Sequence, residues 1–473
     1  MKTRTEEDFI GRLEVPEDAY YGCFTVRASG TFKLSGQKVD LRLIKAVALI
    51  KKAAAAANSE LGTLDAKNAS AIMQAADEVM AGKFDSEFII DAFQAGAGTP
   101  LHMNVNEVVA NRANELLGGK KGAYSPVHPN NHVNMAQSSN DVTPTALRLA
   151  CLLSRKELLD SMESLEKSFA RLGSEHQKTL KSGRTHLMDA VPITYGQAFS
   201  AWARSIASDR MGVVAASERL LEIGLGGTAV GTGINTHPDF KAKVAAKIKE
   251  FSGLDVHPAE DTVRTTNDMN CFLALSGSLR CYASTLNRVC NDLRLLGSGP
   301  NAGIAELILP PVEPGSSIMP GKVNPSVPEA VSMCCWQVCG NDRAIELAVQ
   351  SGQLELNWGT PLIGNGLLQS MELLGNASSM LREKCVEGLK VDERRAAGLL
   401  DKSFVYATAF NPYLGYSLVS KLVTESNSTG VPLRELILEK GLMEKKDIDT
   451  VIASASGPSL TDKKLKERVK GTH

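Results

Sequence analysis

The stretch from Gly315 to Pro325 carries the densest set of chemically useful side chains in the sequence. Two glycines and two prolines among these eleven residues exclude a regular helix, so a loop is expected. The loop presents two hydroxyls, an ammonium and an amide, which belong to Ser316, Ser317, Lys322 and Asn324. Such a set can surround an anion. The glycine and lysine spacing differs from that of a Walker A loop, and the alternative to a site is a surface turn with incidental polarity.

Three other breaks in the chain offer hydroxyl, amide or imidazole groups. Thr185 and His186 stand side by side before a helical pattern, where the alternative is a histidine with a purely structural role. Ser138, Ser139 and Asn140 precede a long helical region, so they can cap that helix or, with exposed backbone N–H groups, bind a carboxylate. Thr99 follows a flexible Gly-Ala-Gly turn.

These loops together indicate the class of ligand. They supply hydroxyls, amides and one lysine, and they lack the paired carboxylates that glycoside chemistry requires. We therefore expect recognition of a small dianion rather than of a sugar or a phosphate ester.

Long helices are the elements that must position these loops. Proline, which long helices exclude, is absent between Pro144 and Pro192, Pro258 and Pro300, Pro328 and Pro361, and Pro361 and Pro412. Apolar residues recur there every three or four positions, as in Leu158, Met162, Leu165, Phe169 and Leu172, in Leu275, Leu279, Tyr282, Leu286, Val289, Leu293 and Leu296, in Phe199, Trp202 and Ile206, and in Leu367, Met371, Leu374 and Leu381. The fold is therefore predicted to be mainly α, with a central bundle of long helices.

Three regions follow from where these patterns begin and end. Residues 1–140 contain shorter helical patterns broken by glycine and proline and are expected to be mixed but mostly helical. Residues 141–397 form the predicted bundle domain, which carries the loop at 315–325. Residues 398–473 are expected to form a small helical domain.

The composition of the chain indicates which classes of binding partner and which cellular compartment to expect. The 52 basic and 53 acidic residues leave a net charge of -1, which gives no basic field for nucleic acid. No apolar run reaches the length of a membrane helix, and the first residues lack the apolar core of a signal peptide. Nine scattered cysteines fit a reducing compartment, so we expect a cytoplasmic protein. Cys334, Cys335 and Cys339 cluster without zinc-like spacing, and neither a metal nor another cofactor is predicted.

The same residues carry a family resemblance that spans nearly the whole chain. The loop from Gly315 to Pro325 resembles the signature loop of the fumarase and aspartase superfamily. Four further segments resemble the same family in the same order, namely residues 103–107, 137–141, 183–186 and 226–233. The resemblance implies a homotetramer in which the central helices of four subunits form one bundle and each active site is assembled from three chains.

The resemblance also implies a reaction and residue roles. It implies anti elimination from a small dicarboxylate, in which Ser316 removes a proton and Lys322 and Asn324 bind a carboxylate. Ser317 would also bind the substrate, and carboxylate binding would be completed by Thr99, Ser138, Ser139 and Thr185. Asn140 and His186 would face the leaving group, and Glu329 would orient His186. His186, Ser316 and Lys322 would thus be the catalytic set.

The leaving group is the harder choice. Residues 15–22, 258–261, 327–329 and 352–357 resemble aspartases, which implies a carbon–nitrogen lyase that converts L-aspartate to fumarate. The pair Ser138-Ser139 and Val105 instead resemble class II fumarases. The same residues also fit a lyase for another amino acid or succinyl compound, or a relative that has lost catalysis.

Several positions depart from the patterns of both groups. His102 stands where the family usually has asparagine, and Pro100, Met188, Tyr195 and Ala198 are also unusual. Because His102 lies three residues from Thr99, we expect it to alter the pocket.

Overall fold

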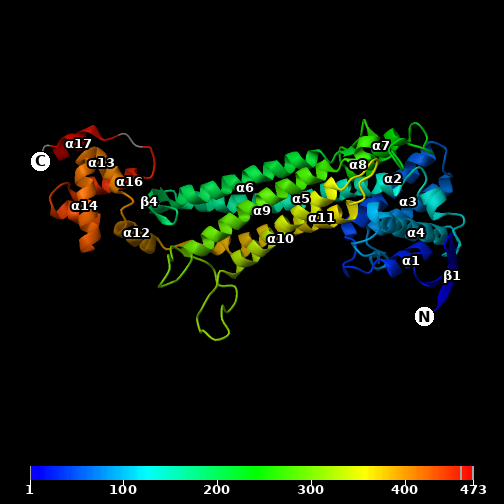
Figure 1. Ribbon diagram of the computed structural model, residues 1–473, viewed down its shortest axis with the longest axis horizontal. Helices are drawn as coiled ribbons and strands as arrows, with labels where there is room; N and C mark the ends of the chain where they lie inside the picture. The colour runs from blue at the N-terminus through cyan, green and yellow to red at the C-terminus, as the bar shows by residue number, and fades with distance from the viewer. Residues whose placement is uncertain (1, 459–460, 471–473) are drawn as a thin grey trace. The chain divides into compact units, whose positions relative to one another are not determined.

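The structure is a computed structural model that describes residues 2–458 and 461–470 of the 473-residue chain. It is predominantly helical, as the sequence predicts (Figure 1). The α-helices are α1 (Cys23–Thr31), α2 (Leu41–Glu60), α3 (Ala66–Met80), α4 (Thr99–Leu116), α5 (Ser139–Glu175), α6 (Tyr195–Glu218), α7 (Phe240–Ser252), α8 (Thr262–Asn267), α9 (Asn270–Leu296), α10 (Ser326–Gln350), α11 (Thr360–Lys384), α12 (Glu393–Lys402), α13 (Ala407–Leu414), α14 (Tyr416–Thr429), α15 (Leu433–Glu439), α16 (Lys445–Ser454) and α17 (Lys463–Lys470).

The strands are short. They are β1 (Thr3–Asp8), β2 (Gly11–Pro16), β3 (Leu180–Thr185), β4 (Met188–Thr194), β5 (Glu222–Ile223), β6 (His257–Pro258), β7 (Leu307–Ile308) and β8 (Lys390–Val391). They pair as β1-β2, β3-β4, β5-β6 and β7-β8, of which only β5-β6 is parallel within the described residues. Such small sheets cannot form a core of their own, so the helices must supply it.

The chain forms two compact units, each made of three segments. Unit 1 contains Met1–Asp160, Asp209–Ser284 and Cys334–Asn376, and unit 2 contains Ser161–Ser208, Thr285–Met333 and Ala377–His473. The five longest helices, α5, α6, α9, α10 and α11, each contribute residues to both units. The division of the chain into regions 1–140, 141–397 and 398–473 stays a prediction.

The predicted apolar stripes are buried except at Leu296, which is half-buried, and this burial confirms the periodicity argument. Leu158, Met162, Leu165, Phe169 and Leu172 of α5 are all buried. In unit 2, Trp202 of α6 lies edge-on to Phe169 and to Phe199, with ring centroids 5.5 Å away in both cases. Edge-to-face packing of this kind adds to the free energy that burial alone supplies.

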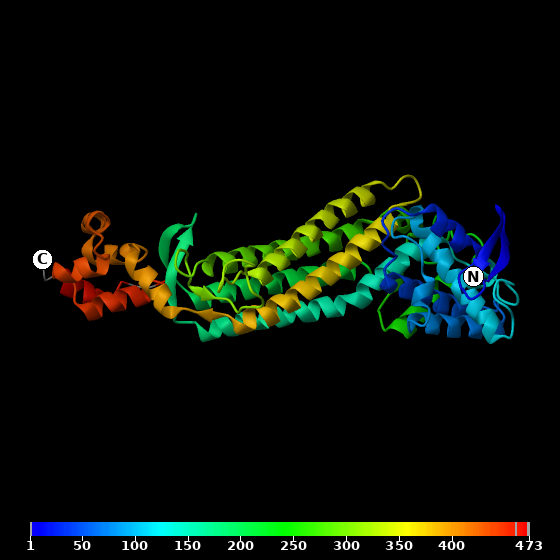
Figure 2. The same cartoon turned by 90° about the horizontal axis from the view of Figure 1, so that it is seen from below.

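In unit 1, α2 contacts α3, α4 and α7, and Figures 1 and 2 show α2, α3 and α4 side by side. The side chain of Asp40 accepts from the backbone N–H of Arg42 at the start of α2, and Asp65 caps α3 in the same way. Such caps satisfy N–H groups that a helix cannot bond internally. The central part of α2 is alanine-rich and buried, which allows its neighbours to approach closely.

The end of unit 2 is a cluster of short helices, α12 to α17. Its buried core includes Leu400, Tyr406, Phe410, Leu436 and Ile448. Of the helices in the described residues, none combines the length and the apolar character that crossing a bilayer requires.

Candidate active site

The loop at 315–325 is closed by its own backbone. The N–H of Gly315 donates to the carbonyl of Lys322 at 2.9 Å, and the Asn324 amide donates to the carbonyl of Gly315 at 2.6 Å. A Cβ at residue 315 would lie 2.6 Å from that Lys322 carbonyl oxygen. Only glycine therefore permits this closure. Asn324, a predicted substrate-binding residue, also fixes the base of the loop.

Ser316 occupies the inside of the first turn of this loop. Its Oγ accepts hydrogen bonds from the backbone N–H groups of Ile318 at 3.2 Å and Met319 at 3.0 Å. Two N–H groups directed at one oxygen stabilise negative charge on it. The Ser316 side chain is half-buried, whereas Ser317 and Lys322 are exposed. The loop can thus hold a serine alkoxide, and it also carries the exposed Lys322.

Thr185 and His186 lie at the tip of the hairpin formed by β3 and β4. Thr185 pairs with Met188, so His186 and Leu187 form the two-residue turn between the strands. Their φ angles are 54° and 61°, in the left-handed region that the twist of a hairpin favours but that side chains other than glycine rarely adopt. The turn exposes both Thr185 and His186.

A buried acid anchors this hairpin. Glu306 is fully buried and accepts from Arg184 of β3 at 2.6 Å and from the hydroxyl of Tyr195 at 2.6 Å. Lys181 lies 3.9 Å from the same carboxylate, and burial lowers the pKa of that lysine. Burying an ion pair is costly unless both partners are well bonded, as they are here. The unusual Tyr195 thus serves the anchor of the hairpin.

Glu329 lies in the first turn of α10, where the helix dipole favours a carboxylate. Within the described residues its ion-pair partner is Arg294 of α9, at 3.7 Å, rather than His186. The predicted pairing of Glu329 with His186 therefore stays a prediction.

In unit 1, the structure gathers Ser138, Ser139 and Asn140 at the start of α5. Asp141, fully buried, accepts from the N–H of Ser138 at 2.9 Å and from the N–H groups of Gly226 and Thr228. The Asn140 amide donates to the carbonyl of Ala229 at 2.8 Å. Burial raises the pKa of Asp141 to about 6, although its three N–H donors oppose this shift. Asp141 thereby joins the serine pair to the glycine-rich segment 226–233.

Thr99 begins α4, directly after Gly98, whose φ of 73° turns the chain into the helix. Three residues later, His102 is buried and its Nδ1 lies 2.8 Å from Oγ of Ser139. This contact links the unusual histidine to one of the predicted carboxylate-binding hydroxyls. The other ring nitrogen, Nε2, lies 2.5 Å from Nζ of Lys51, which is also buried.

The candidate residues therefore fall into two groups. Thr99, Ser138, Ser139 and Asn140 belong to unit 1, and Thr185, His186, Ser316, Ser317, Lys322, Asn324 and Glu329 belong to unit 2. Sequence reasoning missed Lys51, Asp141 and Glu306 as supporting residues. For Lys51 a signal existed, because it interrupts an otherwise apolar run of α2.

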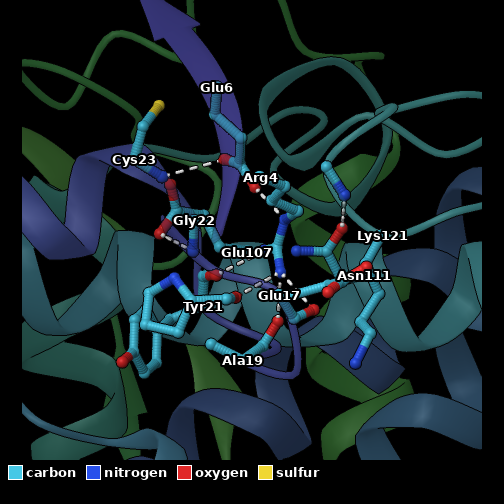
Figure 3. A network of polar contacts seen from close by, with 12 residues as sticks. Arg4, Glu6, Glu17, Ala19, Tyr21, Gly22, Cys23, Glu107, Asn111 and Lys121 are labelled. Atoms are coloured by element: carbon cyan, nitrogen blue, oxygen red, sulfur yellow. Dashed lines mark hydrogen bonds and ion pairs between the residues drawn. The ribbon is translucent and has the colours of Figure 1, made fainter. Parts of the chain in front are cut away.

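A second polar network lies where the N-terminal hairpin meets α1 and α4 (Figure 3). Glu107 accepts from the N–H groups of Gly22, Phe24 and Thr25, and Glu6 accepts from Arg4 and from the N–H of Cys23. The ligand atoms of Glu6, Cys23 and Glu107 lie within 4.8 Å of one another. Both carboxylates already hold donors that a metal would have to displace, and burial raises the pKa of the Cys23 thiol to about 12. The network fits a structural role for these side chains.

Comparison with known proteins identifies the class. Residues 11–340 match a family profile described as lyase, and residues 407–455 match one described as fumarase C C-terminus. The chain therefore belongs to the lyase family and, within it, to the fumarase and aspartase superfamily, as the sequence predicts.

Individual relatives span almost the whole chain. It is 46% identical to aspartate ammonia-lyase of Pseudomonas fluorescens, over 95% of both chains, and 40% identical to that of Bacillus subtilis, over 98% of both. It is also 44% identical to fumarate hydratase class II 1 of Pseudomonas aeruginosa, over 94% of this chain and 97% of that one.

Solved structures agree with this assignment. A fumarate lyase:delta crystallin from Brucella melitensis bound to cobalt gives a TM-score of 0.94 at 40% identity, covering 97% of this chain and 100% of that one. Recombinant class II fumarase from Schistosoma mansoni gives a TM-score of 0.93 at 35% identity, again covering 97% of this chain and 100% of that one.

Proposed function

We propose that the chain is a carbon–nitrogen lyase that reversibly converts L-aspartate to fumarate and ammonium. The single observation that carries this proposal is the turn in which two backbone N–H groups point at Oγ of Ser316. A hydroxyl becomes a usable base only where its anion is stabilised in this way. The similarity to several aspartate ammonia-lyases supports the nitrogen leaving group.

The proposed reaction is an anti elimination. The Ser316 alkoxide takes a proton from C3, and the electron pair left behind is delocalised into the adjacent carboxylate. The pair then forms the C2–C3 double bond while the C2–N bond breaks, releasing ammonia that takes up a proton and leaves as ammonium. The proton on Ser316 returns to water before the next turnover.

The other candidate residues have supporting roles in this proposal. Lys322 and Asn324 hold the carboxylate that accepts the electron pair, and Thr99, Ser138, Ser139, Thr185 and Ser317 complete the binding of the two carboxylates. His186 and Asn140 face the departing nitrogen, and Glu329 orients His186. Contacts between a lysine and a carboxylate strengthen when water is excluded, so the loop at 315–325 is expected to close over the substrate.

The second candidate is hydration of fumarate to L-malate. It is favoured by the adjacent hydroxyls of Ser138 and Ser139 and by the 44% identity to a class II fumarate hydratase. The two activities share the base and the carboxylate sites and differ only in the leaving group.

Incubation with each substrate separates the candidates. We expect absorbance from the conjugated double bond of fumarate to appear with L-aspartate, and aspartate to form from fumarate plus ammonium. L-malate serves as the comparison under the same conditions. Fumarate from L-malate but none from L-aspartate would transfer the assignment to the hydratase.

We also propose a homotetramer with active sites shared between subunits. Met333, Trp336 and Leu347 of α10 are exposed in the single chain, with Trp336 61% accessible. Large apolar residues exposed along one helix are typical of a surface that another chain covers.

Trp336→Glu is accordingly expected to break the assembly, because it places a charge in a buried apolar contact. Light scattering should then report a mass near the 50.6 kDa of one chain instead of about four times that mass. Ser428→Glu, at an exposed polar position of α14, is the matched control and should leave the mass unchanged. A wild-type protein that is active as a stable monomer would contradict the shared site.

A further inference from the structure

Lys51 is a buried amine with three polar neighbours, two amide oxygens and one ring nitrogen of a histidine. Its Nζ lies 2.5 Å from Nε2 of His102, 3.1 Å from Oδ1 of Asn134 and 2.8 Å from Oε1 of Gln137. The side chain is 0% exposed, so these contacts replace water entirely. A buried amine must have such partners, because an unpaired one is costly.

The side-chain amides of Asn134 and Gln137 are held in one orientation by hydrogen bonds that their nitrogen atoms donate. The amide nitrogen of Asn134 donates to the carbonyl of Gln137 at 3.3 Å. The amide nitrogen of Gln137 donates to the carbonyls of Val133 at 3.1 Å and Met135 at 3.0 Å. Neither amide can therefore turn a donor towards Lys51 without losing these bonds. Two of the three neighbours of the amine are thus obligatory acceptors.

The third neighbour, His102, can satisfy either protonation state of Lys51. An ammonium donates three protons, so Nε2 of His102 must accept and the ring proton must sit on Nδ1. A neutral amine donates its two protons to the amide oxygens and accepts a hydrogen bond from Nε2–H. In that tautomer Nδ1 carries no proton. The charge on Lys51 and the tautomer of His102 are therefore coupled.

That coupling reaches Ser139, because Nδ1 lies 2.8 Å from its Oγ. When Nδ1 carries the proton, the serine oxygen accepts and its own O–H is free to donate elsewhere. When Nδ1 is bare, the serine must donate to the ring and presents only lone pairs. A carboxylate ligand needs a donor, so only the first arrangement binds it.

We propose that Lys51 and His102 are positioning residues that decide whether the Ser139 hydroxyl can donate to a substrate carboxylate. This inference rests on the proposed function, in which Ser139 binds a carboxylate. It adds a pH-dependent control of substrate binding by two residues that do not touch the substrate themselves.

The direction of the pH effect follows from the surroundings. Burial lowers the pKa of Lys51 well below its ordinary value, and Asp141 on α5 opposes that shift. Burial also lowers the pKa of His102, with Lys51 as a second cause, and both disfavour the charged ring. The titratable groups facing Lys51 are thus His102 from α4 and Asp141 from α5. Carboxylate binding is favoured at lower pH, where Lys51 is charged, and weakens as pH rises and Lys51 loses its proton.

The first experiment reads the tautomer directly and needs no activity. In the full-length protein labelled with 15N-histidine and sedimented for solid-state NMR, the His102 signal, assigned by its loss in His102→Asn, is followed across the whole pH range in which the protein stays folded. We expect the ring proton of His102 to move from Nδ1 to Nε2 as pH rises. In the Lys51→Met variant the tautomer of His102 should not change with pH. A tautomer that stays constant over this range would overturn the inference.

The second experiment measures binding with succinate, a dicarboxylate without an ionisable amine, by calorimetry over the same pH range. The wild type should lose about 10-fold or more in affinity as pH rises, since a hydrogen bond to a charged group is lost. In His102→Asn the amide nitrogen takes the place of Nδ1 and donates to Ser139 at every pH, so its affinity should stay nearly flat. The Ser139→Ala variant should bind succinate weakly, with an affinity that does not change with pH.

The outcomes separate the two proposals. If succinate binds but the wild type and His102→Asn share one pH dependence, the control through Ser139 is wrong. If succinate fails to bind at any pH, the dicarboxylate site of the proposed function is wrong, while the NMR experiment still decides the coupling of Lys51 to His102.

Discussion

Replacing Ser316 with alanine is expected to lower kcat by about 100- to 10,000-fold, the usual contribution of a positioned general base. The KM should change far less, because Lys322, Thr185 and Ser138 still bind the carboxylates in the proposed site. The backbone N–H groups of Ile318 and Met319 remain in place but have no oxyanion to stabilise. Steady-state kinetics with L-aspartate would measure both constants.

Ser317→Ala is the matched control for this prediction. Ser317 is exposed and adjacent to the base, so its loss should reduce turnover only mildly. If both serines served only to stabilise the turn, either substitution would shift the free energy of unfolding by about 1 kcal/mol and leave turnover nearly intact. A folded Ser316→Ala enzyme with near-normal kcat, judged beside its thermal midpoint, would rule out Ser316 as the base.

Replacing Glu306 with alanine is expected to lower the free energy of unfolding by about 3–5 kcal/mol, the cost of leaving buried charges uncompensated. Glu306 is fully buried, and its removal takes away the hydrogen-bond acceptor of Arg184 and of the Tyr195 hydroxyl. Lys181, 3.9 Å away, loses its counter-charge as well. Denaturant unfolding followed by circular dichroism would measure the change.

Two milder substitutions test the same anchor. Tyr195→Phe removes one hydrogen bond and should cost about 1 kcal/mol, while Glu306→Gln keeps an acceptor but loses the charge and should fall between the two. Because Arg184 belongs to the strand that ends at Thr185, we also expect the alanine variant to lose activity beyond its loss of folded protein. An alanine variant as stable as Tyr195→Phe would show that the buried charges are solvated in some other way.

The helices were predictable because their signals are local and repeated. Proline is absent from α9 and, beyond the first two turns, from α5 and α11, and each apolar stripe recurs over several turns, so both signals survive without tertiary information. The turn at His186 and Leu187 was not predictable as a hairpin. Hairpin turns of this kind are usually signalled by asparagine and glycine, and neither residue stands there.

The polar loops of the site were visible in the sequence, but their supports were not. Ser316, Lys322 and Asn324 stand close together between glycines and prolines, a pattern that predicts a ligand-binding loop. Glu306 stands alone between Ala305 and Leu307, and its partners lie more than a hundred positions away in the chain. A contact at that separation depends on how the helices pack, and no short pattern encodes it.

The interleaved make-up of the two units has a consequence for biosynthesis. Unit 1 needs the segment Cys334–Asn376, and unit 2 needs Ala377–His473, so neither can finish folding while the earlier segments alone have left the ribosome. The apolar stripes of α5, α6 and α9 would meanwhile face water on a nascent chain. We expect the emerging polypeptide to depend on chaperones, and chains truncated between residues 300 and 370 to aggregate rather than to yield one folded half.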